Sequence, residues 1–86
     1  MQLINHDTII DILGDLAPNI LDTLSLRKDQ GVSSINEGYE LVAKEFGQLL
    51  KAKRNNNLEV FEKELEDLVV SAVINLISIR ENICQK

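Results

Sequence analysis

The 86-residue chain has few of the residues on which several classes of protein depend. It has one cysteine, Cys84, which excludes an internal disulfide framework and a cysteine-based zinc site. Sparse cysteine is typical of a reducing compartment, and the amino end has no signal-peptide pattern, so we expect a cytoplasmic protein. Tryptophan is absent and the other aromatic residues number three, too few for the stacking surfaces that bind single-stranded nucleic acid.

The chain also lacks an excess of positive charge and long uninterrupted apolar runs. Its formal net charge of −5 argues against nucleic acid as a partner. The longest apolar region, residues 65–79, is interrupted by acidic and polar side chains, so we expect neither a membrane span nor a membrane partner. Residues 1–86 are long enough for one domain only. So short a chain buries only roughly 60% of its unfolded surface, which favours completion by oligomerisation.

Apolar residues recur at spacings of three and four along the whole chain, which predicts an all-α fold. Because proline cannot donate a backbone hydrogen bond but suits a first helical turn, Pro18 predicts a break between two helices, with a kink in one continuous helix as the alternative. Ser34 followed by Glu37 is a capping-box pattern, and the Asn55–Asn57 run suits a helix end and a new cap. We therefore predict an N-terminal helical segment (1–33) and a helix pair (34–82), with helices over residues 7–16, 18–29, 34–54 and 58 to about 79–82.

The third and fourth predicted helices carry most of the apolar residues. We expect Tyr39 and Phe61 to lie in the core. From Leu65 onward the fourth helix is apolar around most of its circumference, which is typical of burial on more than one side. One short chain hardly supplies both covering surfaces, so we expect a homodimer or homotetramer. The third predicted helix has its apolar face at Ile35, Tyr39, Val42, Phe46, Leu49 and Leu50.

A narrow polar stripe remains on the fourth helix. Its members are spaced so that they share one face, and they are Glu64, Asp67, Ser71, Asn75 and Ser78. The first interpretation is a solvent-exposed edge. The alternative is a polar groove inside a bundle, where helical proteins build metal and ligand sites, with Ser71 and Asn75 supporting the ligands.

Two pairs of polar residues have matching separations on the two predicted helices. Glu45 and Gln48 are three apart, as are Glu64 and Asp67, and a short turn would bring the pairs face to face. Carboxylate clusters of this kind suit Mg²⁺, which in turn binds phosphates. The only histidine, His6, is remote from both pairs, which argues against a histidine-based transition-metal site.

Residues 44–52 (KEFGQLLKA), the link to Lys63, and residues 64–69 (ELEDLV) resemble the MazG-like nucleoside triphosphate pyrophosphohydrolases, which include phosphoribosyl-ATP pyrophosphatases and dimeric dUTPases. The family signature is E-E-x-x-E on one helix and E-x-x-D on the next, and the resemblance spans about residues 35–79. It implies metal ligands at Glu45, Gln48, Glu64 and Asp67. Lys44 and Gln48 depart from the pattern by standing at the first and third glutamate positions of the signature.

The resemblance implies Mg²⁺-dependent (or Mn²⁺-dependent) hydrolysis of a nucleoside triphosphate to the monophosphate and pyrophosphate, with Glu45 or Glu64 as general base. A second register replaces the first pair by Glu37 and Glu40, which are also three residues apart. The loss of charge at Gln48 weakens the expected activity, which leaves an inactive MazG-like binding or regulatory module as an alternative. The remaining alternative is an unrelated all-α protein-interaction domain.

A basic cluster at the end of the third predicted helix consists of Lys51, Lys53 and Arg54. These residues either contact phosphate or, as we favour, interact with the negative end of their own helix.

Overall fold

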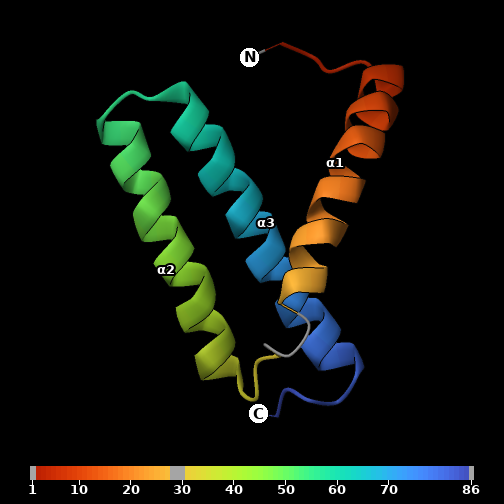
Figure 1. The fold of residues 1–86 in the computed structure, drawn as a ribbon, viewed down its shortest axis with the longest axis vertical. Coiled ribbons are helices and arrows are strands. Elements are labelled where there is room, and N and C mark those ends of the chain that lie inside the picture. Colours follow the sequence, from red (N-terminus) through yellow and green to blue (C-terminus); the bar gives the residue numbers. More distant parts are fainter. Residues whose placement is uncertain (1, 28–30, 86) are drawn as a thin grey trace.

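The computed structural model describes residues 2–27 and 31–85, and in them it contains three α-helices (Figure 1). They are α1 (His6–Leu26), α2 (Ile35–Arg54) and α3 (Leu58–Arg80). The described residues form no β-strand beyond an isolated bridge between Ser34 and Gln85. The all-α prediction is therefore confirmed, whereas the predicted bundle of about four helices is not confirmed, since the described residues form three. None of the described helices has the length and apolarity needed to cross a membrane.

The missing fourth helix is explained by α1, which runs without interruption through Pro18. Proline at this position removes one helical hydrogen bond, the one to the Gly14 carbonyl, and the remaining turns continue. The predicted break is therefore wrong. The helix begins after Asn5, whose side-chain oxygen accepts from the Asp7 N–H at 2.7 Å. It ends at Leu26, and residue 29, near which we predicted the end, lies outside the described residues.

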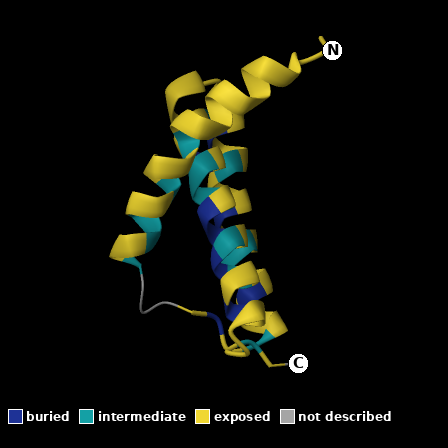
Figure 2. Cartoon of the chain, turned by 90° about the vertical axis from the view of Figure 1, so that its right-hand side faces the viewer, coloured by how far each residue is buried: buried dark blue, intermediate teal, exposed yellow. Residues whose placement is uncertain are grey.

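No residue of α1 is fully buried, and the helix stands away from α3 at its amino end (Figures 1 and 2). Its carboxyl half packs against α3, where Ile20 and Leu24 contact a small core. The buried members of that core are Val32, Val70 and Ile74. The core thus lies at one end of the V formed by α1 and α3, and the other end of the V is open.

The caps of α2 and α3 agree with the sequence prediction. The Ser34 hydroxyl accepts from the Glu37 N–H at 3.1 Å, and the Asn57 side chain accepts from the Val60 N–H at 3.2 Å. Between the helices, Asn56 adopts φ 51°, a left-handed conformation that asparagine tolerates better than most residues. Both helices therefore begin and end within about two residues of the predicted positions, as cap-based assignments usually do.

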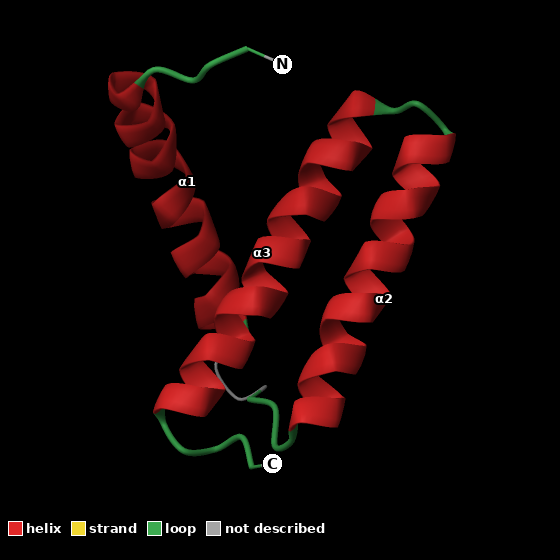
Figure 3. Cartoon of the chain, turned by 180° about the vertical axis from the view of Figure 1, so that it is seen from behind, coloured by secondary structure: helices red, strands yellow, loops and turns green. Residues whose placement is uncertain are grey.

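Helices α2 and α3 run antiparallel, side by side (Figure 3). Small and acidic residues, seven apart on each helix, line the side that faces the other helix or, at Ser78, the residues that lead into α2, and we call these residues the seam. All are buried: Gly38, Glu45 and Ala52 on α2, and Glu64, Ser71 and Ser78 on α3.

An asparagine bridges the two helices at one end of the seam. The Asn75 side-chain amide donates to the Gly38 carbonyl at 3.2 Å and to the Ser71 carbonyl at 2.9 Å. A Cβ atom at Gly38 would overlap the Asn75 Oδ1 atom. Glycine at this position therefore permits the close approach of the helices.

The interpretation of the polar stripe on α3 as a solvent-exposed edge is wrong. Ser71 and Ser78 are fully buried, Glu64 is nearly so, and Asp67 and Asn75 are partly buried. The stripe faces α2 because the seam occupies that side of α3. The backbone carbonyls then satisfy the two serines, since Ser71 donates to the Asp67 carbonyl at 3.0 Å and Ser78 to the Ile74 carbonyl at 2.8 Å.

The predicted core position of Tyr39 is also wrong. Tyr39 is 71% exposed, Phe46 is 59% exposed, and Phe61 is only partly buried. The apolar face predicted for α2 points away from the seam, and the seam residues of α2 contact α3 instead. Within one chain, therefore, polar residues occupy the helix contact and much of the apolar surface faces outward.

Candidate metal centre

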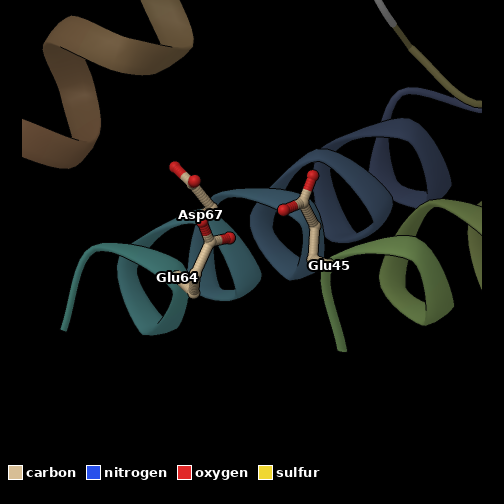
Figure 4. Close-up of side chains that lie close together, drawn as sticks. All are labelled: Glu45, Glu64 and Asp67. Carbon is tan, nitrogen blue, oxygen red and sulfur yellow. The ribbon is translucent and has the colours of Figure 1, made fainter. Parts of the chain in front are cut away.

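Three carboxylates meet across the seam, where α2 contributes Glu45 and α3 contributes Glu64 and Asp67 (Figure 4). One carboxylate oxygen from each residue lies within 4.8 Å of the others. The two α3 residues are three apart and so share a helix face, while the antiparallel pairing brings Glu45 opposite them. The sequence-predicted pair on α3 and one member of the pair on α2 are thus brought together.

Glu64 is the most constrained member of this cluster. Its side chain is 8% exposed, and its buried Oε2 atom finds no hydrogen-bond partner among the described residues. A buried polar atom without a partner costs about 1–3 kcal/mol, and more when the group is charged. Repulsion between neighbouring carboxylates adds to that cost, because charges at such separations interact strongly away from bulk water. A cation bound among the three oxygens would remove both costs.

One positive side chain lies near the cluster. The Lys63 ammonium is 3.7 Å from the Asp67 carboxylate, one helical turn away on α3. The Lys63 side chain is 73% exposed, so solvent screens much of this pair. Lys63 therefore offsets part of the negative charge at Asp67 but does not neutralise the buried Glu45 and Glu64 carboxylates.

The other predicted ligand, Gln48, is exposed on α2 and lies one turn beyond Glu45. It lines a depression of about 370 Å³ together with Glu64 and Lys51. Carbonyl, carboxylate and ammonium groups therefore open onto the same space beside the carboxylate cluster. A volume of this size falls in the range of small-molecule sites.

The other two members of the predicted basic cluster, Lys53 and Arg54, are exposed at the carboxyl end of α2. Lys53 lines a separate depression of about 220 Å³ with Phe61. Their position in the last turn of α2 agrees with the interaction between cations and a helix carboxyl end.

The alternative pair, Glu37 and Glu40, lies in a different place. Both residues line a depression of about 420 Å³ near the amino end of α2, together with Lys44. Glu37 accepts a hydrogen bond from the Ser33 hydroxyl at 2.7 Å. Neither belongs to the cluster with Glu64 and Asp67. The geometry within the described residues thus favours the register that contains Glu45.

Ser71 and Asn75 were predicted to support the metal ligands. The Ser71 hydroxyl and both N–H groups of Asn75 donate to backbone carbonyls, which leaves no donor for a carboxylate. Of these contacts, the Asn75 bond to the Gly38 carbonyl joins α2 to α3 and so sets the spacing of the carboxylates indirectly.

Sequence reasoning missed the part of Gly38 in this arrangement. The seven-residue interval that relates Gly38, Glu45 and Ala52 was a signal that would have located it.

Comparison with known proteins finds no matching family model, no matching curated protein and no matching solved structure.

Proposed function

We propose that this chain is a Mg²⁺-dependent nucleoside triphosphate pyrophosphohydrolase that uses the carboxylates of Glu45, Glu64 and Asp67. The observation that carries the proposal is the Glu64 Oε2 atom, which is buried, without a hydrogen-bond partner among the described residues, and beside two further carboxylates. Three hard oxygen donors suit Mg²⁺ or Mn²⁺ better than softer metals. The resemblance to the MazG-like enzymes supplies the class of substrate and reaction.

In this proposal Glu45 and Glu64 hold the cation from opposite helices, and Asp67 does so from the more exposed side of the cluster. The bound cation would neutralise phosphate charge and lower the pKa of an attacking water. A carboxylate oxygen of Glu45 or Glu64 that is not engaged in binding the metal is available to accept the proton of that water. Because the chain has a net charge of −5, it needs a bound cation to attract a triphosphate.

Lys51 is the basic side chain placed best to contact a phosphate. It shares the 370 Å³ depression with Glu64 and Gln48, whereas Lys53 lines a different one. A phosphate beside the carboxylates would lie within this depression, where the Lys51 ammonium contributes positive charge that the acidic cluster lacks.

A metal-binding module without turnover is the second candidate function, and Gln48 favours it. Glutamine offers a neutral oxygen where the MazG-like family has a carboxylate, and Gln48 lies exposed at the edge of the cluster. A site with three rather than four negative charges binds Mg²⁺ more weakly. Such a module would still be stabilised by the cation but would release no pyrophosphate.

The two functions separate in one experiment on the full chain. Thermal unfolding is followed with EDTA or with millimolar Mg²⁺ or Mn²⁺, and pyrophosphate release is assayed with a panel of nucleoside triphosphates. Saturation at about 100 times the dissociation constant would stabilise the fold by about 2.7 kcal/mol, a rise in the unfolding midpoint of about 10–20 °C. Stabilisation with pyrophosphate release supports the enzyme, and stabilisation alone supports the module. Absence of both effects contradicts the metal site.

Matched double variants assign the effect to the cluster. Glu64→Gln with Asp67→Asn removes two ligands and should abolish metal-dependent stabilisation and any activity. Glu59→Gln with Glu62→Gln removes the same charge, at the same spacing, from exposed positions of α3 and should retain both. Equal behaviour of the two variants would refute the site assignment.

Gln48→Glu tests the fourth ligand. It should raise the affinity for Mg²⁺ because it restores a carboxylate at the family position. An unchanged affinity would show that position 48 takes no part in binding.

A further inference from the structure

Helix α1 carries an apolar stripe that the rest of the chain covers only in part. Its members recur every three or four residues and so share one side of the helix: Ile9, Leu13, Leu16, Ile20 and Leu24. The last three are partly buried, and Ile20 and Leu24 contact the core. The first two are exposed, Ile9 to 40% and Leu13 to 58%. The amino end of the stripe is therefore uncovered.

The four aspartates of α1 lie on the opposite side of the helix. The rotation of about 100° per residue turns all of them away from the apolar stripe, and all are exposed: Asp7, Asp11, Asp15 and Asp22. Helix α1 thus has one side suited to water and one side suited to burial. The amino half of the side suited to burial lacks a covering surface among the described residues.

The side of α3 that faces α1 changes character along the helix. Near the carboxyl end of α3 this side is apolar and contributes Val70 and Ile74 to the core. The residues that continue the same side toward the amino end are all charged, and we call them the charged wall: Glu59, Lys63, Glu66 and Asp67. Three carboxylates and one ammonium give the charged wall a net charge of −2.

The uncovered end of the α1 stripe and the charged wall lie at the open end of the V (Figure 1). If α1 closed onto α3, Ile9 and Leu13 would face these charges and remove them from water. Neither Glu59 nor Glu66 forms an ion pair with another described residue. Desolvation of an unpaired carboxylate costs more free energy than burial of one apolar side chain gains. The mismatch explains why the two helices diverge.

We propose that the open end of the V binds a cationic amphipathic helix of another protein. Such a helix would place its apolar side against Ile9 and Leu13 and its lysine or arginine side chains against the charged wall. Apolar anchors spaced by three and four residues are a recurrent mode of helix recognition.

The charges decide between the possible occupants. A purely apolar segment would remove the carboxylates of the charged wall from water without pairing them. A second copy of this chain has a net charge of −5 and would be repelled by the wall. A cationic amphipathic helix satisfies both sides of the V at once.

Fluorescence anisotropy of two labelled peptides tests the proposal with the full chain in EDTA. Both peptides have about 18 residues, enough to form a helix, and leucines at spacings of three and four. They differ only in having lysine or glutamate at the remaining positions. The lysine peptide should bind at least about tenfold more tightly, and added salt should reduce the difference. Equal affinities, or binding by neither peptide, would overturn the proposal.

Matched double variants locate the bound peptide. Glu59→Gln with Glu66→Gln removes two carboxylates, seven residues apart, from the charged wall and should weaken binding of the lysine peptide by about three- to tenfold. Asp15→Asn with Asp22→Asn removes two carboxylates at the same spacing from the exposed side of α1 and should leave the affinity unchanged. Equal weakening by both double variants would show that net charge alone attracts the peptide, which contradicts the site.

Leu13→Gln tests the apolar side and should weaken binding by about tenfold. Leu26→Gln makes the same change at an exposed position of α1 outside the stripe and should have no effect. Sedimentation equilibrium without peptide tests the other occupant. A mass twice 9.7 kDa that only Leu13→Gln returns to one chain would show that a second copy covers the stripe and would overturn the proposal. If Leu13→Gln lowers the helix content, the charge variants, which keep every apolar residue, decide the outcome.

Discussion

The seam between α2 and α3 and the outward side of α2 differ in a direction opposite to the usual one. The seam is buried yet contains two glutamates, two serines, a glycine and an alanine, whereas Ile35, Tyr39 and Phe46 on the outward side of α2 are exposed. Burial of apolar area is the main stabilising term in folding, and buried acids oppose it. Within one chain, therefore, acids are buried between α2 and α3 while large apolar side chains remain exposed to solvent.

The largest effect is expected where α2 and α3 approach each other closely in the seam. Gly38→Ala should lower the free energy of unfolding by about 1–3 kcal/mol, because the added Cβ displaces Asn75 and its two hydrogen bonds. Urea unfolding measures the loss. Gly47→Ala, on the same helix with no atom within 4 Å of the added Cβ, should instead raise stability by about 0.5–1 kcal/mol. A stabilising Gly38→Ala would contradict the close approach.

A smaller effect of the opposite sign is expected from the buried acid. Without divalent cations, Glu64→Gln should raise the free energy of unfolding by about 1 kcal/mol, and the midpoint by about 4–8 °C, by removing a charge from the carboxylate cluster. Calorimetry in EDTA measures the change. Glu62→Gln, an exposed neighbour on α3, serves as control and should have little effect. Destabilisation by Glu64→Gln would show that the carboxylate has a favourable partner in the apo protein.

The smallest effect is expected at the exposed ion pair. Lys63→Gln removes the partner of Asp67 and should lower the free energy of unfolding by no more than about 0.5 kcal/mol, because Lys63 is largely solvated. Comparing unfolding in low and high salt checks the cause, since added salt should remove the difference. A loss that persists at high salt would indicate a packing contribution from the lysine stem.

Local features of this fold could be predicted from the sequence because their causes are local. Ser34 and Asn57 cap their helices with bonds to residues three positions away, so the pattern of side chains sufficed. Pro18 misled because its local cost is finite and the flanking turns of α1 outweigh it.

The candidate site was predictable only as a choice between registers. Spacing placed Glu64 beside Asp67, but which α2 acids they meet depends on how the helices pack. That packing is determined by Gly38 and Asn75, whose contact joins residues 37 positions apart. The amphipathic pattern likewise identified an apolar face containing Tyr39 and Phe46 but not what covers it, since periodicity cannot distinguish a contact within the chain from one between chains.

The seven-residue interval of the seam has a consequence for how chain length can vary. Inserting one residue into α3 between Glu64 and Ser71 would turn every later side chain by about 100° relative to the earlier ones, so that Ser71 and Ser78 would no longer share a face with Glu64. Inserting seven residues into each helix would add nearly two whole turns and keep the seam residues of each helix in line. We therefore expect natural variants of this hairpin to differ in length by sevens, with the added turns shared equally between α2 and α3.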